Sequence, residues 1–112
     1  MVNREELKNY CNTYLDIYKF KDYCPNGLQI EGSLNITKIV SGVSANLELI
    51  ERAIEEKADA IFVHHGVFWD NESKTISGAK RAKIALLLKH NINLFGFHLP
   101  LDDHYEVGNN VE

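Results

Sequence analysis

The sequence predicts a single α/β domain over residues 1–112, with a mainly parallel sheet and helices on both of its faces. Segments with helical spacing alternate with short apolar segments typical of strands, in the order helix, strand, helix, strand, helix, strand. Strands that are joined through helices in this way imply right-handed crossovers between parallel strands. The 112 residues, of which 45% are hydrophobic and 25% charged, are enough for one hydrophobic core.

The first expected helix spans about residues 3–18, where apolar and tyrosine side chains recur at three- and four-residue steps. Asn3 followed by Glu6 resembles a capping box at its start. Residues 22–32 contain one proline and two glycines, and they are expected to form a turn or loop.

The rest of the chain alternates between strands and helices. Compact β-branched side chains indicate buried strands, and apolar residues with charged residues on the other faces indicate helices. The expected elements are a buried strand at 36–44, a helix at 47–58, a strand at 59–63, a helix at 77–90 and a strand at 91–97.

The net charge of −4 comes from twelve Lys and Arg against sixteen Asp and Glu. This balance disfavours a general electrostatic attraction to nucleic acid or anionic lipid. The longest uninterrupted apolar run, Ile84 to Leu88, is far shorter than the ~20 residues of a membrane span. The acidic start is unlike a signal peptide, and the lone pair Cys11 and Cys24 fits a reducing compartment. The sequence therefore predicts a cytoplasmic protein.

Histidines follow two of the three predicted strands. His64 and His65 come directly after the second strand, and His98 follows the third, with Asp102 and His104 shortly beyond. Because ligands in an open α/β sheet bind beyond the carboxyl ends of the strands, we expect these side chains to gather at one edge of the sheet.

A metal site is the chemistry that this group favours. Neighbours on a strand point in opposite directions, so His64 and His65 suit two adjacent ions better than one. The alternative is one hydrogen-bonded core histidine and one solvated histidine. His98 and Asp102 flank Pro100, which favours a turn, and histidine with carboxylate suits Zn, Fe, Mn or Co. Two ions need about eight donor positions, so water, substrate, another subunit or further sequence must complete the set.

Three groups of short motifs occur in order along the chain. They are Lys21-Asp22-Tyr23 with Pro25-Asn26-Gly27-Leu28-Gln29 and Glu31-Gly32; Val63-His64-His65-Gly66 with Phe68-Trp69; and Asn91-Ile92-Asn93-Leu94 with His98-Leu99-Pro100-Leu101-Asp102 and Gly108-Asn109-Asn110. Together they resemble the GTP cyclohydrolase 1 type 2 family, the YbgI-type dinuclear metal-binding proteins, over nearly the whole chain.

The resemblance implies that His64, His65 and Asp102 are ligands of two divalent ions per subunit, such as Zn, Fe or Mn, and that His98 lies beside them. It also implies a homohexameric ring with the metal sites facing an interior cavity. Family members are about twice as long and complete the site with a later His-x-x-x-Glu motif, which this chain does not contain. We therefore expect an N-terminal portion of such a protein, with a truncated paralogue as the alternative.

The leading functional hypothesis is a dinuclear metal-dependent hydrolase that acts on GTP or a modified purine nucleotide. Metal-activated water would attack the purine imidazole ring at C8, and His98 or His104 could move the proton. The alternative is a ring-forming metal-binding scaffold or regulatory protein without turnover. A third hypothesis, a nucleic-acid-binding ring, is disfavoured by the net charge.

The third expected helix carries four basic residues. We expect them to form a solvated helix face, with reception of substrate phosphates as the alternative. These residues are Lys80, Arg81, Lys83 and Lys89.

Overall fold

A computed structural model describes residues 2–15, 26–68 and 75–98. These ranges contain short strands and three helices, none of which is long and apolar enough to cross a membrane. The elements are β1 Val2–Asn3, α1 Arg4–Tyr14, β2 Gly27–Ile30, β3 Asn35–Ile36, β4 Ile39–Ser44, α2 Leu47–Glu55, β5 Ala60–His65, α3 Gly78–Lys89 and β6 Asn93–Gly96.

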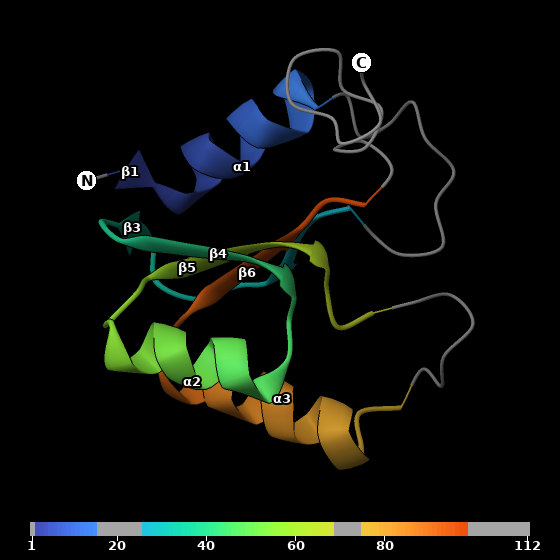
Figure 1. The fold of residues 1–112 in the computed structure, drawn as a ribbon. Coiled ribbons are helices and arrows are strands. Elements are labelled where there is room, and N and C mark those ends of the chain that lie inside the picture. Colours follow the sequence, from blue (N-terminus) through green and yellow to red (C-terminus); the bar gives the residue numbers. More distant parts are fainter. Residues whose placement is uncertain (1, 16–25, 69–74, 99–112) are drawn as a thin grey trace.

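Four strands form the central sheet, in the order β2-β6-β5-β4 (Figure 1). The neighbours β4, β5 and β6 are parallel, whereas β2 pairs with β6 in the antiparallel sense. The short strands β1 and β3 form a separate antiparallel pair. The predicted α/β fold with a mainly parallel sheet is therefore confirmed for the central sheet, and the two antiparallel pairs are additions to it.

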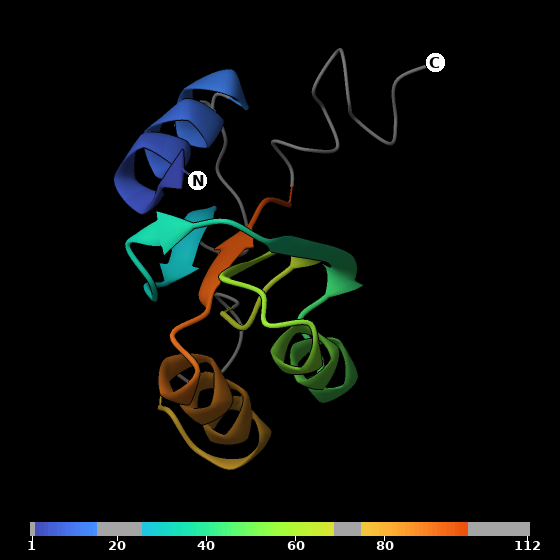
Figure 2. The same cartoon turned by 90° about the vertical axis from the view of Figure 1, so that its left-hand side faces the viewer.

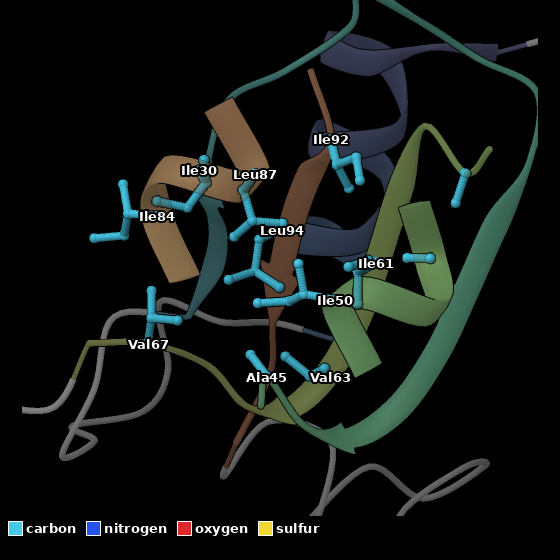
Figure 3. Close-up of a cluster of buried hydrophobic side chains, with 12 residues drawn as sticks. Ile30, Ala45, Ile50, Ile61, Val63, Val67, Ile84, Leu87, Ile92 and Leu94 are labelled. Carbon is cyan, nitrogen blue, oxygen red and sulfur yellow. The ribbon is translucent and has the colours of Figure 1, made fainter. Parts of the chain in front are cut away.

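The larger hydrophobic core lies between the sheet and the helices α2 and α3 (Figure 3). Ile50 of α2 and Leu87 of α3 are completely buried, as are Ile61 of β5 and Leu94 of β6. All four belong to one cluster. Their removal from water supplies the main favourable contribution to folding at this face of the sheet.

A second cluster lies on the side of the sheet that faces α1. Leu7 and Cys11 of α1 pack against a group that contains the buried Phe95, and the rings of Phe62 and Phe95 stack at 4.7 Å. Figures 1 and 2 both place α1 across the sheet from α2 and α3. Asn3 caps α1, since its Oδ1 accepts hydrogen bonds from the backbone at the start of the helix.

The predicted loop at residues 22–32 is wrong for residues 27–30, because Gly27–Ile30 forms the strand β2. Its partner is β6, with Gly27 opposite Gly96. Gly27 has a φ of 112°, which glycine adopts without the steric cost that other residues have. The turn residues therefore begin a strand whose partner lies far along the chain.

The predicted buried strand at residues 36–44 is wrong in extent and in burial. The chain forms two strands there, because Asp59 Oδ2 accepts hydrogen bonds from the backbone N–H of Thr37 (2.9 Å) and Lys38 (3.2 Å) between them. β4 is an edge strand, and its Val43 is 70% exposed. The β-branched residues thus form a strand with one covered face.

β5 includes His64 and His65, so these histidines are the last residues of the strand and do not follow it. The predicted helix at 77–90 is confirmed as α3, with Ser77 and His90 as its capping residues. The strand and the helix therefore lie close to their predicted positions on either side of residues 69–74, which lie outside the described part.

Asn93 at the start of β6 is fully buried and polar. Its Oδ1 accepts a hydrogen bond from the Gly32 N–H at 2.7 Å, and its Nδ2 donates to the backbone oxygens of Ser33 (2.8 Å) and Asp59 (3.0 Å). These bonds fasten the segment between β2 and β3 to the amino ends of β5 and β6, opposite the edge where the histidines lie.

Candidate metal centre

Three imidazole rings gather at the carboxyl edge of the central sheet. His64 and His65 end β5, and His98 lies just beyond β6. The ring centroid of His64 is 4.4 Å from that of His65 and 4.7 Å from that of His98, and the His65 and His98 centroids are 5.3 Å apart. One ring nitrogen from each residue lies within 4.8 Å of the others. The structure therefore brings together the histidines of the two predicted strand ends.

The parallel register of β5 and β6 explains why these histidines meet. Val63 lies opposite Gly96, and beyond that pair the backbone N–H of Phe97 donates to the Val63 oxygen at 3.0 Å. The same register, continued to the next residues, places His98 beside His65. Pairing of the two strands thus fixes the backbone from which both imidazoles extend.

His64 and His65 line different cavities. His64 contributes with Phe62 and Phe97 to an apolar cavity of about 290 Å³. His65 contributes with Lys83 to a more polar cavity of about 620 Å³. The linings agree with the expectation that neighbours on a strand face opposite sides. The two rings still come close, because both residues stand at the end of the strand, where imidazoles can turn toward each other.

Asn26 holds the backbone of His98 in place. Its side-chain Oδ1 accepts a hydrogen bond from the His98 N–H at 2.8 Å, across 72 positions of the sequence. Asn26 directly precedes β2, so this bond anchors the segment after β6 to the neighbouring strand. Asn26 belongs to one of the family motifs, and the sequence predicts a turn around it but not this bond to the backbone of His98.

Gln29 of β2 holds the turn that follows His65. Its Oε1 accepts a hydrogen bond from the Val67 N–H at 3.0 Å, across 38 positions. Gly66 and Gly96 lie directly against the Gln29 amide; a Cβ at Gly66 would overlap it, and one at Gly96 would lie 3.0 Å from Nε2. The glycines therefore make room for a side chain that positions the histidine-bearing backbone.

The donor set fits a transition metal. Imidazole nitrogen is a common ligand of zinc, iron, copper and nickel, and the three histidines are half-buried, which leaves them accessible. Three nitrogen ligands suit one ion that keeps a further position for water or substrate. Within the described residues they are the only group of histidine, cysteine or carboxylate side chains arranged in this way.

The remaining predicted site residues lie outside the described part of the chain. These are Asp102, predicted as a metal ligand, and His104, predicted as a proton carrier. His90, the one histidine for which no site role is predicted, is the C-cap of α3 and precedes β6, so it belongs to the opposite edge of the sheet. The roles predicted for His64, His65 and His98 stay predictions.

Comparison with known proteins places these features in a family. The sequence matches Duf34/NIF3 (NGG1p interacting factor 3) over residues 2–112. A curated relative from Neisseria meningitidis serogroup A, named GTP cyclohydrolase 1 type 2 homolog, is 51% identical over 112 residues, covering 100% of this chain and 45% of the relative. A relative of the same name from Yersinia pestis is 50% identical over 107 residues, covering 96% of this chain and 43% of the relative. The chain thus spans less than half the length of these relatives.

Solved structures agree on the fold. The protein ybgI, described as of unknown function, superposes with a TM-score of 0.94 at 48% identity, covering 97% of this chain and 44% of that one. A protein from Thermus thermophilus gives a TM-score of 0.91 at 40% identity, covering 96% of this chain and 45% of that one. Reduced HcgD from Methanocaldococcus jannaschii gives 0.78 at 23% identity, with coverage of 90% and 41%, and shows the shared fold alone.

Proposed function

The chain belongs to the Duf34/NIF3 family, as the resemblance read from its motifs predicts, and on this basis we propose that the protein is a metal-dependent hydrolase acting on a nucleotide. The observation that supports this proposal most is the cluster of His64, His65 and His98, with ring nitrogens within 4.8 Å of one another. The name of the curated relatives, GTP cyclohydrolase 1 type 2 homolog, suggests a purine nucleotide as the substrate.

We assign the three histidines to the metal and to proton transfer. His64 and His65 would each offer one ring nitrogen as a ligand. His98, whose backbone is held by Asn26, would either complete the set or carry the proton that the reaction moves. His104 is the second candidate for the proton carrier, and Asp102 is the candidate carboxylate ligand.

Bound divalent ions would lower the pKa of a coordinated water and neutralise negative charge that develops on the substrate. A second ion needs donors beyond the three histidines. Asp102 and the part of the relatives' length that this chain does not span are the sources we propose for them. Zn, Fe and Mn are the ions that such a mixed nitrogen and oxygen set would take.

The apolar cavity beside His64 is suited to the flat base of a nucleotide. Phe62 and Phe97 line it together with Leu15. Aromatic rings stack favourably on the faces of other rings, so a purine in this cavity would lie next to the His64 imidazole. His64 is the member of the histidine cluster that lines this cavity, so it would connect the base to the proposed metal centre.

Metal analysis of the full-length protein tests the site. His64→Ala should lower the number of bound ions per subunit, measured by elemental analysis after exposure to Zn, Mn or Fe. His90→Ala is the matched control, because this histidine caps α3 away from the cluster, and it should leave the ion content unchanged. Equal ion content in His64→Ala and the wild type would contradict the assignment.

Activity distinguishes the hydrolase from the alternative. The metal-loaded full-length protein should release product from GTP or from an oxidised or modified purine nucleotide. If no nucleotide is converted while the ions stay bound, the protein is better described as a metal-binding scaffold or regulatory protein. The two outcomes also differ in coordination, since a structural metal has no open position.

The family resemblance further suggests a hexameric ring with the metal sites toward its interior. Native mass spectrometry or sedimentation of the full-length protein measures the number of subunits directly. A monomer at micromolar concentration would contradict the ring and would leave the metal assignment to stand on the histidines.

A further inference from the structure

We infer that the polar cavity beside His65 is a binding subsite for the phosphate groups of a phosphate-bearing substrate. The inference rests on the proposed function, because a nucleotide whose base reaches the proposed metal centre also carries phosphates that the protein can bind. The cavity has a volume of about 620 Å³, which lies in the ordinary range of small-molecule sites.

The cavity is rich in hydrogen-bond donors. It lies where the carboxyl ends of β4 and β5 meet the beginnings of α2 and α3, and its lining includes Ser44, Asn46, His65, Lys80 and Lys83. None of the described residues that line it is acidic. The whole chain carries a net charge of −4. The two lysines therefore give this cavity a positive charge, opposite in sign to the net charge of the chain.

The structure separates the four basic residues of α3 into two pairs. Lys80 and Lys83 line the cavity, whereas Arg81 and Lys89 are exposed and do not. The spacing of three residues between Lys80 and Lys83 puts both on the same side of the helix. The exposed Arg81 and Lys89 agree with the expectation of a solvated basic face, whereas Lys80 and Lys83 are half-buried at the cavity.

Lys80 contacts the segment that follows β5, and Lys83 lines the cavity with His65. Lys80 Nζ lies 4.7 Å from the centre of the Phe68 ring, a cation–π contact with the segment that follows β5. Lys83 is half-buried and forms no ion pair with an acidic side chain among the described residues. Its ammonium group can therefore donate to a phosphate oxygen in the cavity.

His65 connects this subsite to the metal centre. It is one wall of the cavity and one member of the histidine cluster. A phosphate held by Lys83 would consequently lie on one side of β5, while the apolar cavity beside His64 lies on the other side. The arrangement matches a substrate with a charged end and a flat apolar end.

Titration calorimetry with inorganic tripolyphosphate tests the inference on the metal-free full-length protein, where a metal ion cannot bind the anion itself. Lys83→Gln should weaken tripolyphosphate binding by roughly tenfold, the loss expected for one charge-assisted hydrogen bond. Lys80→Gln should also weaken it. Arg81→Gln is the matched control on the same helix and should bind as the wild type does. Guanosine, which has no phosphate, should bind equally to all variants.

Several results would overturn the subsite. These are no tripolyphosphate binding by the metal-free protein, wild-type affinity in Lys83→Gln, or an equal loss in Arg81→Gln, which would indicate attraction to the general charge of the helix. Failure of the proposed function would give a different result. If tripolyphosphate binding depends on Lys83 but the protein converts no nucleotide, the anion subsite is supported and the hydrolase is contradicted. If Lys83→Gln turns over GTP with the same kcat/KM as the wild type, the hydrolase is supported and the phosphate subsite is contradicted.

Discussion

Gln29 and Asn26 show how single side chains can set the geometry of a site without belonging to it. Each accepts one backbone hydrogen bond from a histidine-bearing segment, Gln29 from Val67 and Asn26 from His98. A backbone N–H that loses its partner inside a protein costs about 1–3 kcal/mol. The two side chains therefore restrict where the imidazoles can be.

Gln29→Leu is expected to weaken metal binding. It keeps the size of the side chain but removes the acceptor for the Val67 N–H, so the turn after His65 can move. We expect a loss of roughly tenfold or more in metal affinity, comparable with the effect of other residues that orient metal ligands. Competition with a chromogenic chelator measures this affinity on the full-length protein.

Asn93→Ala is the matched control for this prediction. It also deletes buried amide hydrogen bonds, but at the amino end of β6, away from the histidines. It should lower the free energy of unfolding while the folded protein keeps its metal affinity. If Gln29→Leu and Asn93→Ala change metal affinity equally, Gln29 contributes only to general stability.

At the level of single residues, the sequence predicts the histidine cluster and misses its support. His64, His65 and His98 follow from a general rule about the carboxyl ends of parallel strands. The bonds of Asn26 and Gln29 join positions 72 and 38 apart, and no local pattern encodes such a contact. The family motif that contains both residues was the one signal that pointed to them.

The start of α1 shows how charge stabilises an element. Glu5 accepts hydrogen bonds from Lys8 Nζ at 2.8 Å and from Arg4 Nε at 3.0 Å. These two bonds lower the pKa of the Glu5 carboxyl from its ordinary value of 4.5, and the bond from Lys8 has the larger effect. An acidic residue in the first turn also interacts favourably with the helix dipole.

The pH dependence of this contribution has a definite sign. Because the pKa is lower in the folded state, the ionised Glu5 stabilises the fold above about pH 4.5, and the contribution is lost as the pH falls through the folded-state pKa. The advantage of the wild type over Glu5→Gln in thermal unfolding should therefore shrink as the pH falls from 7 to 3. Glu6→Gln is the control, because Glu6 forms no ion pair within the described ranges. The assignment would be contradicted if the advantage of the wild type over Glu5→Gln grew as the pH fell.

Among the elements, those with local signals are predicted and those that depend on distant partners are not. Helix α3 forms at Gly78–Lys89, where the sequence predicts a helix over residues 77–90. Strand β2 exists because it pairs with β6, and its glycine and the asparagine before it suggest a turn when they are considered alone. The same reasoning applies to β4, which lies at the edge of the described sheet because it pairs with β5, whose other neighbour is β6.

On the scale of the whole molecule, metal binding should stabilise the fold, because the three histidines join the ends of β5 and β6. A ligand that binds the native state at 100 times its Kd adds about 2.7 kcal/mol. For a protein of the relatives' size, this corresponds to a rise in Tm of roughly 5–10 °C. Differential scanning calorimetry with Zn, and again with a chelator, measures the shift.

The variants of the metal site separate specific from general stabilisation. His64→Ala should lose most of the rise in Tm, and His90→Ala should keep it. If Zn raises the Tm of His64→Ala as much as that of the wild type, the ion binds elsewhere in the molecule.

The family and the mainly parallel sheet could be predicted for the molecule as a whole, because motifs and alternation extend along nearly the entire chain. The complete ligand set could not be predicted from these residues. Three histidine nitrogens are too few for two ions, and the chain covers only 45% of the length of its relative from Neisseria.

The packing of Gly66 and Gly96 on the Gln29 amide has an evolutionary consequence. An alanine at Gly66 would overlap the Gln29 amide and displace it from the Val67 N–H that it accepts from, and one at Gly96 would crowd the same amide at 3.0 Å. A shorter side chain at position 29 would restore the space but remove the acceptor. We therefore expect substitutions at positions 29, 66 and 96 to occur together among related sequences.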